Sequence, residues 1–365
     1  MTLPRHPLLD HAPPTPAQFA AVEVAVARIL RTDDDVVILQ AEAALAIEAV
    51  LLGVVRPGMR TLCLSSGPYG VWFAQDLRKL GAELTLIEVD SRNAVDPADV
   101  AAALELDPSI ALVVFVHGES LSGNVNPAAE ICKIVRAHGA LCIVDAVASI
   151  GAHPLETSKW GIDICIAGPQ KGLAGSSGTS LVSVSARAWK AMRENPSAPR
   201  GSFLSLLDWK ERWIDAGRVQ IPGTPAVVEM LALEAACARV LQEGLDQVIA
   251  RHERAARGAR AGVRALGLEL WPVRDEVASN LVTVVAVPAS VDAEAVRTSA
   301  LELGLSLTAG SGSLAGKILR IDHMGAAAFP DAVFASLVAL GAALRHRGVH
   351  VDVSEAIGAA GDAFL

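Results

Sequence analysis

The chain has 365 residues, with 31 Lys and Arg against 40 Asp and Glu, which gives a net charge of −9. This length suggests two domains with a large buried core, and a composition of 52% hydrophobic and 19% charged residues excludes long disorder. The acidic balance argues against binding to nucleic acid, and no uncharged apolar run reaches the roughly 18 residues of a membrane span.

Targeting and redox signals point to the cytoplasm. Residues 1–16 carry prolines where a secretory signal peptide has its apolar stretch, so export is not expected. The five cysteines are widely spaced and form no C-x-x-C pair, and most of them lie in apolar runs. We therefore expect a reduced cytoplasmic protein with no metal site.

The first part of the chain alternates short β-branched runs with longer helical patterns. Near-continuous apolar strands joined by helices are typical of a parallel sheet covered on both faces. The strands are predicted at Val36–Leu39, Thr61–Leu64, Leu84–Ile87, Leu112–Val116, Leu141–Val144, Ile162–Ile166 and Ser180–Val184. The helices between them are predicted at Ala43–Val55, Val71–Leu80, Pro97–Leu106 and Ala128–His138.

After about residue 222 the pattern changes to a smaller α+β unit. Two long helices are predicted at Val227–Gly244 and Leu245–Leu266, and a last helix at Pro330–Arg345. Strands are predicted at Leu268–Trp271, Leu281–Val287 and Lys317–Ile321. We predict an α/β fold with a large domain over residues 1–250 and a small C-terminal domain over residues 251–365.

Two residues at predicted strand ends carry the clearest chemistry. Asp145 directly follows one strand and Lys171 follows the next, in the segment IVDAVASIGAHPLETSKWGIDICIAGPQKGLAG. Ligands of such sheets bind at the carboxyl ends of the strands. There, an acid can pair with a protonated ring nitrogen and a lysine amine can form a Schiff base with an aldehyde, as pyridoxal chemistry requires. The alternative is that Lys171 is an exposed loop residue and Asp145 a helix cap.

At this point the sequence resembles the class V aminotransferases of fold type I, the alanine–glyoxylate and serine–pyruvate group. The resemblance runs from about residue 36 to 345 and rests on four ordered motifs: VDAVAS, GPQKGL, PGTPAVVEMLALEAA and LRIDHMG. It implies a large domain with a mostly parallel seven-stranded sheet between helices and a smaller C-terminal α+β domain. It also implies a homodimer or homotetramer whose active sites lie across the subunit interface.

The resemblance assigns a role to each matching residue. It implies that Lys171 is the Schiff-base lysine, that Asp145 pairs with the pyridinium nitrogen, and that Val147 packs on one face of the ring. Tyr69, in SSGPYG, matches an aromatic that stacks on the other face, with a core aromatic as the alternative. Three further residues are assigned: Arg320 to the substrate carboxylate, with a structural ion pair as the alternative, and Ser120 and Ser122, in HGESLSG, to the ring's 3-oxygen.

The loop that holds the 5′-phosphate of pyridoxal phosphate in this family departs from the usual pattern. Its glycines are replaced in the run LQAEAALAIEA, and Glu42 stands where the phosphate is expected. A carboxylate about 5 Å from a phosphate costs on the order of 5 kcal/mol at an effective dielectric near 20. Gln170 and Thr224 of this end are kept, whereas Pro169 and Ile221 replace a hydroxyl residue and a tyrosine.

These departures predict a ring with a neutral 5′-hydroxymethyl group. The sequence is similar to the branch of the family that converts pyridoxamine and pyruvate to pyridoxal and L-alanine in vitamin B6 degradation. This similarity implies that pyridoxal and pyridoxamine are substrates, with no tightly bound cofactor. One alternative is a conventional alanine–glyoxylate-type aminotransferase with pyridoxal phosphate, and another is a catalytically silent vitamin-binding paralogue.

Two further departures leave the amino acceptor open. An arginine expected in the glycine-containing loop before LRIDHMG is Ser311 here, so the 2-oxo acid need not be pyruvate. The glycine–proline segment that opens the family and lines its substrate pocket has no clear match, with His11–Pro16 at best a remnant. The expected partners are small molecules and further copies of this chain.

Overall fold

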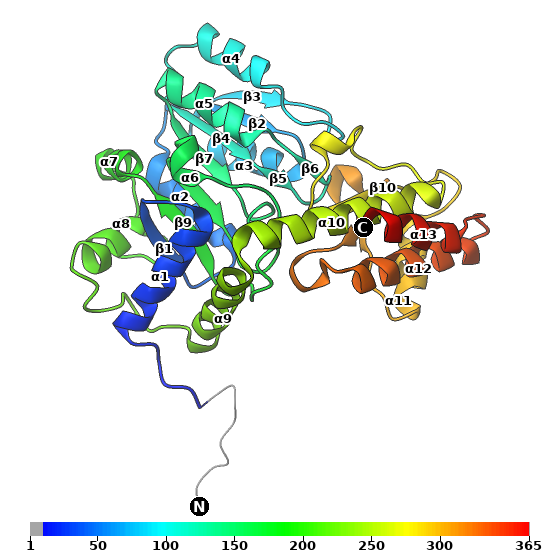
Figure 1. Ribbon diagram of the computed structural model, residues 1–365. Coiled ribbons are helices and arrows are strands. Elements are labelled where there is room, and N and C mark those ends of the chain that lie inside the picture. The colour runs from blue at the N-terminus through cyan, green and yellow to red at the C-terminus, as the bar shows by residue number, and fades with distance from the viewer. Residues whose placement is uncertain (1–9, 365) are drawn as a thin grey trace, which may run out of the picture.

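The computed structural model describes residues 10–364. It has a large part built around one central sheet and a smaller part that contains the C-terminus, with helix α10 running between them (Figure 1). Sequence-based expectations for residues 1–9 lie outside the described residues.

The central sheet has seven strands in the order β1-β9-β8-β7-β4-β2-β3. The strands pair in parallel except for β9, which runs antiparallel to β1 and β8. Every residue of β4 and β9 is buried, as the continuous apolar runs predict. The strands are β1 (Asp35–Leu39), β2 (Arg60–Ser65), β3 (Glu83–Glu88), β4 (Leu112–Val116), β7 (Leu141–Asp145), β8 (Ile164–Ala167) and β9 (Ser180–Val184).

Helices connect these strands and cover the sheet. The first of them, α1, begins after Thr15, whose hydroxyl accepts the N–H of Gln18 in a capping box. The helices of this part are α1 (Pro16–Leu30), α2 (Ala43–Val54), α3 (Pro68–Lys79), α4 (Pro97–Leu106), α5 (Ala128–His138), α6 (Thr157–Trp160), α7 (Ala186–Glu194), α8 (Leu206–Trp209), the π-helix η1 (Lys210–Ile214) and α9 (Val227–Glu243). A two-stranded hairpin, β5 (Gly118–Glu119) and β6 (Asn124–Val125), follows β4.

The smaller part packs helices against a three-stranded antiparallel sheet in the order β10-β12-β11. Its strands are β10 (Val282–Ala286), β11 (Thr308–Ala309) and β12 (Ile318–Asp322). Its helices are α10 (Leu245–Ala265), α11 (Ala293–Glu302), α12 (Pro330–His346), α13 (Val353–Phe364) and the 3₁₀ turns η2 (Asp275–Val277), η3 (Gly312–Leu314) and η4 (Gly325–Ala327). The largest buried cluster ends at Val248 and the next begins at Ala255. The division of the chain at residue 250 stays a prediction.

The predicted α/β fold of type I, with its seven-stranded sheet and small C-terminal unit, is confirmed. The expected strand at Leu268–Trp271 is wrong, because only an isolated bridge between Leu270 and Val285 forms there. Within residues 10–364, no helix is long and apolar enough to cross a membrane. In the same range, no three His, Cys, Asp or Glu side chains group so that they could hold a metal ion.

Candidate active site

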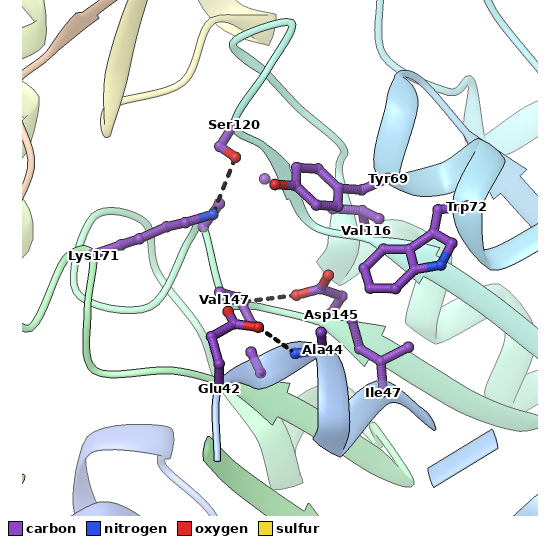
Figure 2. Close-up of a pocket in the computed structure, with 13 residues that line it drawn as sticks. Glu42, Ala44, Ile47, Tyr69, Trp72, Val116, Ser120, Asp145, Val147 and Lys171 are labelled. Atoms are coloured by element: carbon purple, nitrogen blue, oxygen red, sulfur yellow. Dashed lines mark hydrogen bonds between the residues drawn. The ribbon is translucent and has the colours of Figure 1, made fainter. Parts of the chain in front are cut away.

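A cavity of about 380 Å³ lies at the carboxyl ends of the central strands (Figure 2). Val116 ends β4 and Asp145 ends β7, and both line this cavity together with Lys171, which follows β8. Parallel strands bring their carboxyl ends to one edge of the sheet, so residues far apart in sequence meet there. Six of the predicted site residues line the cavity: Glu42, Tyr69, Ser120, Asp145, Val147 and Lys171.

Lys171 reaches into this cavity from the turn after β8. Its Nζ donates to Ser120 Oγ at 3.1 Å and lies 5.5 Å from the centroid of the Tyr69 ring. Burial lowers the pKa of Lys171, and the nearby carboxyl of Asp145 opposes this shift. A lower pKa leaves more of the amine neutral, which is the form that attacks a carbonyl carbon.

Glycines allow the close packing that holds the lysine turn in place. A Cβ on Gly172 would lie 2.2 Å from the carbonyl oxygen of Ile150. Gly325 of the smaller part has a φ of +58°, and a Cβ there would lie 2.7 Å from the carbonyl oxygen of Lys171. The turn that carries Lys171 therefore packs against both parts of the molecule.

Asp145 is a buried carboxylate at the floor of the cavity. Only 5% of the residue is exposed, and its Oδ1 accepts the N–H of Val147 at 2.8 Å. Burial raises the pKa of Asp145 to about 6, since a low-dielectric site disfavours the charged form. A cationic group that enters the cavity would stabilise the ionised carboxyl, because opposite charges attract strongly there.

Tyr69, on the wall of the cavity, is held by Glu119, an acid to which the sequence analysis gave no role. Tyr69 lies in the first turn of α3, and Glu119 Oε2 accepts its N–H at 2.8 Å, while Oε1 accepts the N–H of Leu121 at 3.2 Å. Glu119 is 1% exposed, and burial raises its pKa to about 7. Its carboxyl thus ties α3 to the β5–β6 hairpin that carries Ser120. An acid inside HGESLSG, shortly after the apolar strand β4, was the available signal.

At the other end of the cavity, Glu42 caps helix α2. Its Oε2 accepts the N–H of Ala44 at 2.8 Å, and its Oε1 accepts a hydrogen bond from Gln170 Nε2 at 3.0 Å. The amide oxygen of Gln170 is buried and has no hydrogen-bond partner among the described residues. The positive end of α2, where an anion would bind, is therefore occupied by a carboxylate of the chain itself.

Four predicted site residues lie outside the lining of this cavity: Gln170, which bonds Glu42, Arg320, described below, and Ser122 and Thr224. Ser122 is fully buried and its hydroxyl donates to the carbonyl oxygen of Ser66 at 3.4 Å. Thr224 lines a second cavity of about 750 Å³, and its carbonyl oxygen accepts from Gln40 Nε2 at 3.3 Å. The structure does not bring the side chains of Ser122 and Thr224 to Lys171.

Arg320 is joined to the site through the backbone of Ser120. Its Nη1 donates to the Ser120 carbonyl oxygen at 2.9 Å, and its Nε and Nη2 contact the carboxylate of Asp322. Because Lys171 bonds the hydroxyl of the same serine, Ser120 lies between the amine and the guanidinium. Arg320 is both an ion-paired residue and a neighbour of the cavity.

Four histidines are buried near the junction of the two parts. His117 and His153 have ring centroids 5.9 Å apart, and His323 Nε2 lies 2.8 Å from the hydroxyl of Thr283. Burial lowers the pKa of His117 and His252 to about 4 and that of His323 to about 3. Burial also lowers the pKa of His153, so all four are neutral at neutral pH.

A seven-stranded sheet with a lysine and a buried aspartate at its carboxyl edge defines a fold type I enzyme of the aminotransferase kind. Comparison with protein families agrees: the model of aminotransferase class V matches residues 12–338. The chain belongs to this family and is an aminotransferase, as the sequence predicted.

Several known proteins are similar over most of their length. The pyridoxamine–pyruvate transaminase of Mesorhizobium japonicum is 37% identical over 98% of this chain and 91% of the relative. The L-aspartate–glyoxylate aminotransferase of Paracoccus denitrificans is 33% identical over 76% of this chain and 70% of the relative. The crystal structure of pyridoxamine–pyruvate aminotransferase from Mesorhizobium loti superimposes with a TM-score of 0.92 over 95% of this chain and 88% of that chain, at 37% identity.

The expectation that no cofactor is tightly bound is wrong. Class V aminotransferases of this kind depend on pyridoxal phosphate, and the family match places this chain among them. The residues present fit the ring of that cofactor, since Lys171 and the buried Asp145 face one cavity beside Tyr69. At the 5′ end, the N-terminus of α2 would hold the phosphate beside the Glu42 carboxylate, which already accepts the N–H of Ala44.

Proposed function

We propose that this aminotransferase moves an amino group between pyridoxamine and a small 2-oxo acid, with pyridoxamine and pyruvate giving pyridoxal and L-alanine. The observation that carries the proposal is the carboxylate of Glu42, bonded to Ala44 N–H and to Gln170 at the 5′ end of the cavity. A neutral 5′-hydroxyl can donate to this carboxylate, whereas a phosphate in the same place lies beside a like charge, which weakens its binding. Pyridoxamine has the same ring as the cofactor of the family, so both compete for one cavity.

The residues around the ring position each have a role in this proposal. Asp145 holds a proton on the ring nitrogen, because a buried carboxylate is stabilised by a cationic partner. Tyr69 and Val147 pack on the two faces of the ring. Ser120 faces the ring's 3-oxygen, and Ser122, whose hydroxyl donates to a backbone carbonyl, supports the same turn.

Lys171 is the reacting amine of the proposal. When bound, the ring withdraws electrons from the carbon that carries the amino group, which makes a C–H bond there acidic. Lys171 Nζ moves that proton from the aminomethyl carbon of pyridoxamine to the α-carbon of the acceptor. The hydroxyl of Ser120, which accepts a hydrogen bond from Nζ at 3.1 Å, orients the amine for this transfer.

Arg320 binds the carboxylate of the 2-oxo acid in this proposal. Its Nη1 and the Nζ of Lys171 bond to the carbonyl and hydroxyl oxygens of one residue, Ser120. In a 2-oxo acid, the carboxylate is attached directly to the reacting carbon. The spacing of the guanidinium and the amine across one residue therefore suits this class of substrate.

A conventional aminotransferase of the alanine–glyoxylate type is the second candidate. It is supported by Gln170 and Thr224, which the phosphate end keeps, and by the 33% identity to the enzyme of Paracoccus denitrificans. In that case an amino acid replaces pyridoxamine as the donor, and the residues around Lys171 have the same roles.

Product analysis with purified protein separates the two candidates. Pyridoxamine with pyruvate is expected to yield equal amounts of pyridoxal and L-alanine, and the Lys171→Ala variant is expected to yield neither. A titration of the same protein with pyridoxal should give the visible absorbance band of a ring bound to the lysine. Turnover of L-alanine with glyoxylate, and none of pyridoxamine, would reject the proposal in favour of the second candidate.

The homodimer or homotetramer and the cytoplasmic location remain part of this proposal. Phe203 beside the second cavity is 88% exposed, which suits burial against another subunit. Sedimentation analysis of the purified chain tests the assembly, and a monomer would reject it.

A further inference from the structure

Arg320 and Asp322 form an ion pair on strand β12, next to the proposed acceptor position. The two residues alternate with a buried isoleucine, so their side chains lie on one face of the strand. Asp322 Oδ2 accepts from Arg320 Nη2 at 3.0 Å, and Asp322 Oδ1 accepts from Nε. Thr308, directly opposite Arg320 on β11, donates its hydroxyl proton to Asp322 Oδ2 at 2.8 Å. The carboxylate is thus held from two strands.

This pairing decides which part of the guanidinium is free. A guanidinium presents pairs of parallel N–H groups along its Nε–Nη2 side and along its Nη1–Nη2 end. Asp322 covers the Nε–Nη2 side, Nη1 also donates to the Ser120 carbonyl oxygen at 2.9 Å, and Nη2 makes a longer contact of 3.5 Å with Thr308 Oγ1. A substrate carboxylate therefore meets Arg320 end-on, at the Nη1–Nη2 end, with Asp322 beside it.

The charges around the site disfavour a second carboxylate on the substrate. Glu42, Glu119 and Asp145 all act electrostatically on Lys171, and Asp322 acts on Arg320. Of these carboxyls, Asp322 contacts Arg320 directly, whereas Glu119, with its pKa raised to about 7, is partly protonated at neutral pH. The side chain of Asp322 is 30% exposed and that of Arg320 is 14% exposed, so the negative partner is the more accessible of the two.

We infer that Asp322 is a positioning residue that restricts the amino acceptor to 2-oxo acids with one carboxylate and an uncharged side chain. It holds Arg320 so that one carboxylate binds end-on, and its own charge repels a second carboxylate. This inference rests on the proposed amino transfer and names the class of acceptor that the same site takes.

The test compares pyruvate with 2-oxoglutarate as acceptors in the wild type and in Asp322→Asn. The asparagine keeps one oxygen that can accept from Arg320 and removes the charge. The ratio of kcat/KM for pyruvate to that for 2-oxoglutarate is expected to fall about tenfold, through a lower KM for 2-oxoglutarate with kcat little changed. Asp331→Asn, which removes a charge from an exposed residue of α12, is the matched control and should leave the ratio unchanged.

A second variant separates charge from orientation. Thr308→Val removes the hydroxyl that bonds Asp322 and contacts Arg320 Nη2, and it leaves the charge, so it should raise KM for both acids and leave their ratio constant. An unchanged ratio in Asp322→Asn, or an equal change of ratio in Thr308→Val, would overturn the inference. Melting temperatures of both variants show that they are folded.

Measuring the binding of unreactive acids tests the role of Asp322 without pyridoxamine as a donor. Propionate and succinate are titrated into the protein by saturation-transfer NMR, with no pyridoxamine present. The wild type should bind propionate with higher affinity than succinate. In Asp322→Asn the ratio of these two affinities should fall about tenfold. If pyridoxamine is not a donor but the acid preference shifts in this way, the proposed function fails and the role of Asp322 holds. If the preference does not shift, the role of Asp322 fails.

Discussion

Replacing Glu42 with glutamine should change which form of the vitamin the cavity binds. The glutamine can still cap α2 and contact Gln170, so the change removes a charge and little else. Repulsion between a carboxylate and a phosphate about 5 Å away is about 5 kcal/mol at an effective dielectric near 20, which sets the upper limit. Because Glu42 is exposed to solvent, which weakens the repulsion, we expect a gain in affinity for pyridoxal phosphate of at least tenfold, or about 1.4 kcal/mol.

The assay is an absorbance titration of cofactor-stripped wild-type and Glu42→Gln protein with pyridoxal and with pyridoxal phosphate. The affinity for pyridoxal should stay the same or fall, since the 5′-hydroxyl loses a charged acceptor. Glu48→Gln, which removes a charge from an exposed residue of the same helix, is the control and should change neither affinity. Equal affinities of wild-type and Glu42→Gln protein for the phosphorylated form would refute the reasoning about the 5′ end.

Three further outcomes are expected. Lys171→Ala should lower the rate of amino transfer at least a thousandfold, measured as pyridoxal formed, while the ring still binds without its visible band; a smaller loss would mean that another group moves the proton. Arg320→Lys should raise KM for the 2-oxo acid about tenfold or more with kcat little changed, because a planar pair of donors is lost; a loss of kcat alone would argue against carboxylate binding. The buried histidines bind protons in the unfolded chain near pH 6.5 but only near pH 4 or below when folded, so stability should fall as the pH drops through this range, by up to about 2 kcal/mol per histidine at pH 5. The raised pKa of Asp145 and of Glu119 acts in the opposite sense, and thermal melting of His323→Gln between pH 5 and 7.5 should show a smaller fall than the wild type; an equal fall would contradict this assignment.

The family and the main features of the fold could be predicted from local sequence patterns. Apolar runs of four to six residues are typical of strands that are buried on both faces. The ends of two of these runs place Asp145 and the turn that carries Lys171 at one edge of the sheet. The predicted strand at Leu268–Trp271 failed, because its residues found only one bridge to β10. A short apolar run forms a strand only where a neighbouring strand is available to pair with it.

The contacts that define the site depend on long-range folding. The sequence analysis gave Glu119 no role within HGESLSG. In the structure its two carboxyl oxygens join α3 to the β5–β6 hairpin. The bond between Gln170 and Glu42 joins residues 128 positions apart, which no local pattern indicates. The roles of the individual site residues remain predictions for the experiments above.

The sequence by itself determined most of the elements and the family, and it predicted which lysine reacts, because periodicity and ordered motifs are local properties. Only the tertiary structure decided that Glu42 also bonds Gln170 and that Asp322 covers one side of Arg320. Hydrogen bonds of this kind depend on where backbones lie to within about an ångström, and this is set by the packing of the whole chain. The proposed choice of substrate therefore depends on the folded molecule, whereas the class of chemistry was already evident in its motifs.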